Sequence, residues 1–244
     1  MAFERDHQTT LRTGAQAGAR AQAGPIDMGL RAYMLRVYNY MASGLALTGI
    51  TAMAVAQSES LLQLIFGTPL SWVVMLAPLA FVMVLSFGIN KMSAQTAQAV
   101  FWVFAVVMGV SMASIFMMYT GASIARVFFI TAGTFAGMSL YGYTTKKDLT
   151  GLGSFLMMGL IGLIIASVVN IFLNSPMLYW VISIAGVGIF VGLTAYDTQK
   201  IKLMYTADDG HEAITKKAIM GALTMYLDFI NLFIMLLRLF GDRR

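Results

Sequence analysis

Two acidic residues lie inside stretches of sequence that are otherwise apolar. Asp228 belongs to the run Y-L-D-F-I-N-L-F, and Asp197 belongs to Y-D-T-Q-K-I at the end of the preceding apolar stretch. An aspartate at the centre of a membrane helix costs about 2.5–3.5 kcal/mol, so it must face the protein interior or water and be paired or protonated. If the two carboxyl groups meet, we expect them to share one proton and to titrate as a single unit.

A pair of this kind has two chemical uses. With its proton it is a sensor of pH, and without it the pair offers hard oxygen ligands of the type that Ca²⁺ prefers. Two carboxylates assisted by a few carbonyls and waters would hold a cation loosely, as a conduction site must. Asp197 and Asp228 are therefore predicted to form a proton-sensing, Ca²⁺-binding pair, with Ca²⁺ as a permeant ion and no tightly bound cofactor.

Simpler interpretations of the two acids stay open. Asp228 and Asn231 lie three residues apart on one helix face and could serve only as polar contacts between helices. Asp197 could be an ordinary residue of a loop at the inner membrane surface. Tyr196 and Tyr226 are expected to be packing residues that at most support the acids, and the same holds for Asn231.

Lys91 is the basic residue whose position invites a role in gating. It lies at the inner end of the second apolar stretch, where a lysine ordinarily extends its charge to the membrane surface and helps to set orientation. The alternative is that Lys91 is the cationic partner of the two acids.

The composition shows that the elements carrying these residues lie in a membrane. The 244 residues are 59% hydrophobic and only 11% charged, whereas a soluble domain carries about 25% charged residues. Seven apolar stretches are each long enough to span a bilayer as a helix, and they lie near 34–56, 70–90, 99–119, 123–144, 152–173, 177–197 and 216–240. We expect an all-α protein, with a flexible cytoplasmic tail at 1–30 and a seven-helix transmembrane domain at 31–244.

The positive charges indicate how the chain is oriented. With the N-terminus inside, all but four of the 16 lysines and arginines lie on the inner side; the exceptions are Arg126, Arg238, Arg243 and Arg244. Because Lys and Arg accumulate in cytoplasmic segments, we predict a cytoplasmic N-terminus and an outside C-terminus. The same placement explains the net charge of +5, so membrane lipid is expected as a partner and nucleic acid is not.

Several chemistries are excluded or disfavoured. The chain has no cysteine, which rules out disulfides and thiolate-bound metals. His7 and His211 both lie in polar stretches, so neither an imidazole zinc site nor a Ser-His hydrolase is expected in the membrane. Intramembrane aspartyl proteases need G-x-G-D, whereas Tyr-Leu precedes Asp228, and we do not expect an enzyme.

Close packing between helices is also predicted from small residues four positions apart. Gly133 with Gly137 and Gly188 with Gly192 form two such pairs, and pairs of this kind let helix backbones approach.

The two aspartate motifs, the seven spans and K-K-D-L-T-G-L-G-S-F-L at 146–156 resemble the transmembrane Bax inhibitor motif (Bax inhibitor-1-like) family in its bacterial inner-membrane form. The resemblance covers about residues 30–241. It implies a bundle with the seventh helix at its centre and a pH-sensitive calcium leak gated by an aspartate pair, at positions that match Asp197 and Asp228.

The resemblance also implies a cationic latch and a second function. Family members studied as channels carry an arginine near the inner end of the second helix that latches the aspartates, and an ungapped alignment places this position at Lys91. Lysine lacks the guanidinium fork, so a latch here would be weaker or absent. Some bacterial relatives are associated with a membrane-bound AAA protease, so the alternative function is regulation of other membrane proteins by binding them.

Overall fold

The computed structural model describes residues 28–244, and the statements below concern this part of the chain. The described elements are helical and follow one another in this order: α2 (Met28–Ala56), α3 (Glu59–Phe66), α4 (Leu70–Gly88), the short 3-10 helix η1 (Ile89–Lys91), α5 (Ala94–Met118), α6 (Gly121–Thr144), α7 (Thr150–Leu173), α8 (Pro176–Leu203) and α9 (His211–Phe240). The predicted tail at 1–30 lies outside the described residues except for 28–30, which belong to the first turn of α2.

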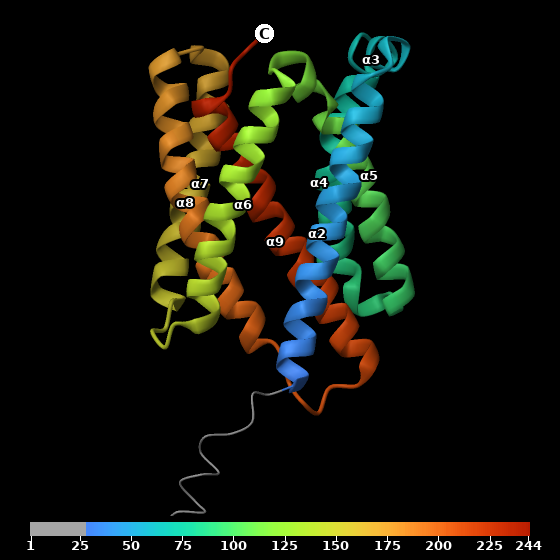
Figure 1. Ribbon diagram of the computed structural model, residues 1–244, viewed down its shortest axis with the longest axis vertical. Coiled ribbons are helices and arrows are strands. Elements are labelled where there is room, and N and C mark those ends of the chain that lie inside the picture. Colours follow the sequence, from blue (N-terminus) through green and yellow to red (C-terminus); the bar gives the residue numbers. More distant parts are fainter. Residues whose placement is uncertain (1–27) are drawn as a thin grey trace, which may run out of the picture.

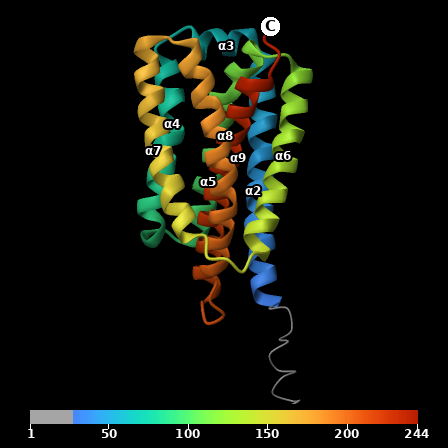
Figure 2. The ribbon, with the colours of Figure 1, turned by 90° about the vertical axis from the view of Figure 1, so that its left-hand side faces the viewer.

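The chain is an all-helical, multi-pass membrane protein. The six helices from α4 to α9 are long and apolar enough to cross a membrane, and α2 with α3 makes a seventh if this pair, bent by 100°, counts as one span. α2 runs alongside the other long helices, and α3 lies across one end of the bundle (Figures 1 and 2). The predicted apolar stretches agree with the long helices, and the gap between the first two stretches, residues 57–69, contains α3.

Local sequence sets the helix ends. The side chains of Ser93, Thr120 and Ser175 accept hydrogen bonds from backbone N–H groups three residues later, and they begin α5, α6 and α8. Asn174 ends α7 in the left-handed conformation with φ of 47°, and Pro176 opens α8 at a position where its missing N–H is harmless.

The connection between α6 and α7 is tied to the end of α8. Gln199 accepts a hydrogen bond from the N–H of Leu149 at 2.9 Å and donates one to the carbonyl of Lys147 at 2.8 Å. In the same connection, the hydroxyl and N–H of Thr150 hold the pKa of Asp148 below its ordinary value, because both stabilise the ionised carboxylate. The end of α8 that carries Asp197 is therefore held against a neighbouring loop.

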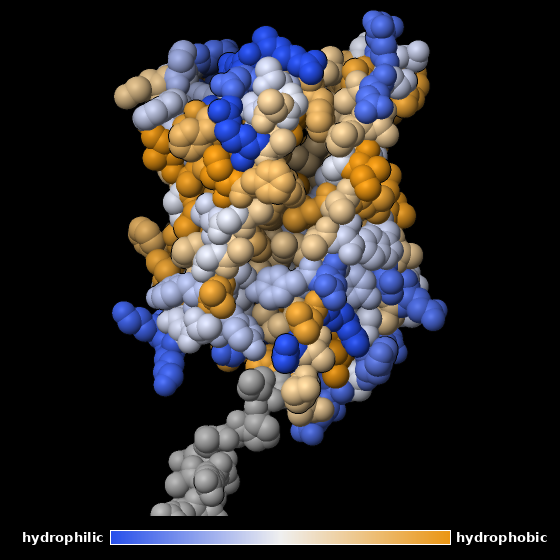
Figure 3. All heavy atoms as spheres, viewed as in Figure 1, coloured by the Kyte–Doolittle hydropathy of each residue, from blue (hydrophilic) through white to orange (hydrophobic). Residues whose placement is uncertain are grey.

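α9 is the most buried of the candidate spans. In its most apolar window 72% of the residues are buried, against at most 33% in any other candidate span. It packs against α8, α2, α6 and α5, and in Figure 1 it runs obliquely across the bundle. On the face in Figure 3, hydrophilic residues gather at the two ends and hydrophobic residues between them.

The predicted close contacts at Gly133, Gly137 and Gly188 are wrong. A Cβ atom added at any of these three would meet no atom within 4 Å, because the three glycines are exposed on the outside of their helices. Among the glycines of residues 28–244, the closest approach to another backbone is instead at Gly142, where an added Cβ would lie 2.1 Å from the carbonyl oxygen of Ala195. α6 and α8 therefore touch backbone to backbone near the turn that carries Asp197.

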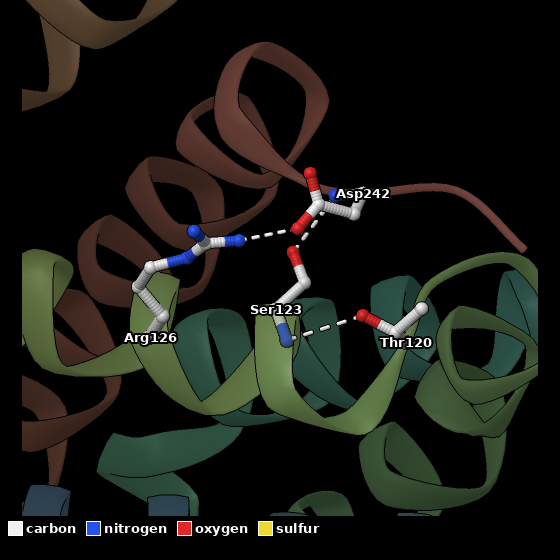
Figure 4. Close-up of polar contacts among 4 residues, drawn as sticks. All are labelled: Thr120, Ser123, Arg126 and Asp242. Atoms are coloured by element: carbon white, nitrogen blue, oxygen red, sulfur yellow. Dashed lines mark hydrogen bonds and ion pairs between the residues drawn. The ribbon is translucent and has the colours of Figure 1, made fainter.

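The last residues of the chain clasp the connection between α5 and α6. Thr120 donates its N–H to the carbonyl of Asp242, and the N–H of Asp242 donates to the hydroxyl of Ser123 at 2.8 Å. Arg126 pairs with the carboxylate of Asp242 (Figure 4), and Arg243 lies over the ring of a neighbouring tyrosine. Arg126 and Arg243 are two of the four basic residues that the predicted orientation places on the outer side, and both have partners at this end of the bundle.

Candidate functional site

Asp197 on α8 and Asp228 on α9 are brought together by the fold. The two carboxyl groups are close enough to interact directly with each other, and the residues are only 9% and 6% exposed. Asp197 lies in the last two turns of α8 and Asp228 near the middle of α9. They meet because the connection after Leu203 carries the chain away from α8, and α9 then returns obliquely (Figure 1).

One oxygen of the pair has no hydrogen-bond donor among residues 28–244. Oδ2 of Asp228 is buried and accepts no hydrogen bond from any group in residues 28–244. Two ionised carboxylates are both acceptors, so a hydrogen bond between them requires a proton on one of them. The contact is therefore of the kind that a shared proton would stabilise.

The basic residue that interacts with the pair is Lys200 and not Lys91. Lys200 lies one turn after Asp197 on α8 and interacts with it electrostatically, while its Nζ lies 5.9 Å from the ring centre of Tyr196. The side chain of Lys91 is exposed and forms no ion pair or hydrogen bond with residues 28–244. Lys200 is one of the inner-side charges that predicted the orientation, although its spacing from Asp197 already places both residues on one helix face.

The other residues named from the sequence take no part in the contact between the two carboxyl groups. The hydroxyl of Tyr226 lies 2.7 Å from that of Thr48 on α2. Tyr196 packs against α7, where a Cβ on Gly153 would lie 2.4 Å from its ring. Asn231 is half-buried, and its side chain forms no hydrogen bond with residues 28–244. These positions agree with packing roles for the two tyrosines.

A chain of hydroxyl groups passes beside the pair. Thr198, which follows Asp197, lies 2.9 Å from the hydroxyl of Ser139 on α6, and that hydroxyl lies 2.5 Å from the hydroxyl of Tyr38 on α2. Thr198 also donates to the carbonyl of Thr194 at 2.7 Å. The chain links α2, α6 and α8 around the turn of Asp197, and no sequence signal indicated it because its members are far apart along the chain.

The pair by itself is not a closed metal site. Within residues 28–244, no group of three or more His, Cys, Asp or Glu side chains comes together. Because Ca²⁺ takes about six to eight oxygen ligands, the two aspartates could hold it only with carbonyls and waters. Such a donor set suits transient contact with a passing ion better than permanent binding.

The chain matches a known protein family over almost its whole length. Residues 30–244 match the family described as inhibitor of apoptosis-promoting Bax1. The chain belongs to this Bax inhibitor-1-like family. The resemblance inferred from the aspartate motifs is thereby confirmed.

Individual members of the Bax inhibitor-1-like family are similar along the same range. An uncharacterised protein of Rickettsia prowazekii is 51% identical over 218 residues, which cover 89% of this chain and 92% of the relative. The inner membrane protein YbhL of Escherichia coli K12 is 49% identical over 219 residues, with 88% and 94% covered. An uncharacterised membrane protein of Streptococcus pyogenes serotype M3 is 34% identical over 218 residues, with 88% and 94% covered.

Proposed function

We propose that this protein is a pH-sensitive cation leak pathway, that Asp197 and Asp228 together sense pH, and that Ca²⁺ is the permeant ion. The observation that supports this proposal is the buried contact between the two carboxyl groups. One shared proton would hold the groups together, whereas loss of that proton would leave two like charges in contact at a site with little water. Protonation is thereby coupled to the packing of α8 against α9.

The proposal assigns separate roles to the charges around the pair. Lys200 supplies the positive charge that an ionised Asp197 attracts, whereas Lys91 sets orientation and does not latch the acids. Ca²⁺ passes the pair as a transient ligand rather than residing there as a cofactor. No catalytic reaction is assigned to the two aspartates.

The proposal also includes the arrangement in the membrane. α2 crosses the bilayer together with α4–α9, so that the chain has seven spans and α9 is enclosed by the others. An odd number of spans fits the positions of the start of α2 and the C-terminus at opposite ends of the structure (Figure 1). The basic residues near Lys146 and Lys216 then face the cytoplasm together with the N-terminus. The name of the relative YbhL supports the bacterial inner membrane as the location.

The direct test measures Ca²⁺ flux from loaded liposomes as a function of pH. We expect a pH-dependent flux for the wild-type protein and a flux that no longer varies with pH for Asp197→Asn and for Asp228→Asn. Asp148→Asn is the matched control, because Asp148 is an exposed acid outside the spans and its loss should leave the pH dependence intact. Wild-type pH dependence in both Asn variants of the pair would refute the mechanism.

The alternative function, regulation of other membrane proteins such as a membrane-bound AAA protease, would use exposed segments and not the buried aspartates. Deletion of residues 1–27 separates the two functions. The leak proposal expects the flux and its pH dependence to survive this deletion, whereas a partnership mediated by the N-terminal segment should be lost.

A further inference from the structure

An apolar groove follows the seam between α2 and α6. Its volume is about 760 Å³, which falls in the range of about 300–1,000 Å³ that is usual for small-ligand sites. Ala42 and Ala46 line it from α2, Ala132 and Ala136 from α6, and Phe229 from α9. Because these alanines are short, the space between α2 and α6 is left unfilled. We call this space the α2–α6 groove; the two helices that border it lie side by side on the face shown in Figure 1.

One end of the α2–α6 groove is positively charged. Arg31 and Tyr143 line this end. Lys202 on α8 donates a hydrogen bond to the carbonyl of Tyr143 at 2.8 Å and lies 5.0 Å from its ring centre. None of the described residues that line the groove is acidic, and Arg31 forms no ion pair or hydrogen bond with residues 28–244. This end is therefore complementary to an anion.

The dimensions of the groove fit a lipid chain. Between Arg31 and Ala46, α2 rises by about 22 Å. The hydrocarbon layer of one leaflet is about 15 Å deep, half of the bilayer's apolar thickness. A chain whose head lies at Arg31 would therefore reach the middle of the bilayer without leaving the groove.

We propose that the α2–α6 groove binds one acyl chain of an anionic phospholipid, with its phosphate held by Arg31. An arginine can hold a phosphate through two parallel N–H bonds, and Lys202 adds positive charge to the same end. The lipid would contact Phe229 and Ser139, which line the groove. Binding is independent of the proposed ion leak, so either proposal can fail without the other.

The natural absence of cysteine allows a direct binding experiment. Leu140→Cys places a fluorophore at the groove, on a side chain that is 63% exposed in the wild type. The labelled full-length protein is reconstituted into vesicles of phosphatidylcholine and phosphatidylglycerol, with bromine on the chains of one lipid or the other. Quenching of the fluorophore by the brominated chains measures which lipid lies beside the label. We expect brominated phosphatidylglycerol to be preferred about fivefold at this label, the factor contributed by one cation near an anionic headgroup. A label at Ile165→Cys, on an exposed position of α7, should show no such preference.

Three further substitutions separate the effect of the charge from that of the groove. Arg31→Gln in the labelled protein should remove the preference, and Arg31→Lys should retain part of it. Ala136→Phe keeps the charge but fills the space between α2 and α6, and should also remove the preference. Equal quenching by the two lipids at Leu140→Cys would overturn the proposal, and so would a preference that is unchanged by Arg31→Gln or by Ala136→Phe. Each variant is first shown to retain the helical content and elution profile of the parent.

Discussion

The carboxyl groups of Asp197 and Asp228 are in contact, although one residue lies close to the end of α8 and the other near the middle of α9. The oblique course of α9 brings them together (Figure 1). The contact makes the two residues parts of one site, so that neither substitution acts independently of the other.

Substitutions of the two acids should therefore be non-additive. We expect Asp197→Asn and Asp228→Asn to show a coupling of about 0.5–3 kcal/mol in a double-mutant cycle, the range typical of residues in contact. The measurement is thermal unfolding of the purified protein in detergent at one fixed pH. Asp148→Asn combined with Asp228→Asn is the control and should be additive. Additivity for the Asp197 and Asp228 variants as well would mean that the carboxyl groups do not interact in solution.

Lys91 and Lys200 should differ in their effect on the pH response. Lys91→Gln is expected to leave the pH profile of Ca²⁺ flux unchanged, because Lys91 contacts neither acid. Lys200→Gln should move the midpoint toward higher pH, because a nearby positive charge favours the ionised carboxylate. Lys200 is exposed, so the displacement should be small and should shrink as salt is added. A shift caused by Lys91→Gln alone would restore the latch expected from the family resemblance.

Two glycines of α6 form a matched pair for testing helix packing. Gly142→Ala should destabilise the protein by about 1–3 kcal/mol or more, since its Cβ would collide with the backbone of Ala195 on α8. Gly137→Ala introduces the same methyl group where no atom lies within 4 Å, and it should be neutral or slightly stabilising because alanine favours helix. Thermal unfolding of both variants side by side decides the matter, and equal losses of stability would contradict the α6–α8 contact.

The C-terminal clasp should depend more on its backbone bonds than on its ion pair. Arg126 and Asp242 are both exposed, so Asp242→Asn should change stability by no more than about 1 kcal/mol. Deletion of residues 242–244 also removes the backbone bond from Thr120 and the bond to Ser123 that Figure 4 shows, and it should loosen the start of α6. Hydrogen exchange of residues 120–126 reports this directly. Protection that is unchanged by the deletion would show that the clasp does not order this turn.

Tyr226 should contribute to stability without affecting the pH response. Tyr226→Phe removes one buried hydrogen bond to Thr48 and should cost about 1 kcal/mol, which lowers Tm by about 2–4 °C in a chain of this size. The pH profile of the flux should stay unchanged, because this hydroxyl is bonded to α2 and not to the acids. A shifted profile would assign Tyr226 to the titrating site.

The sequence by itself determined the helical spans, the family and the identity of the two acids. Long apolar runs can only be buried in lipid or protein, and local signals such as Ser175 and Pro176 end one helix and begin the next without help from distant residues. An aspartate inside such a run is costly wherever it lies, so Asp197 and Asp228 stood out before any fold was known.

Only the tertiary structure decided which side chains meet. Lipid and protein interior are both apolar, so a hydrophobic pattern does not tell which face of a membrane helix points inward. For this reason the sequence indicated a contact at Gly137 but not the one at Gly142, and it offered Lys91 but not Lys200 as a possible partner of the acids. The rotation and tilt of each helix, above all the oblique course of α9, set these contacts, and they depend on packing among all the helices at once.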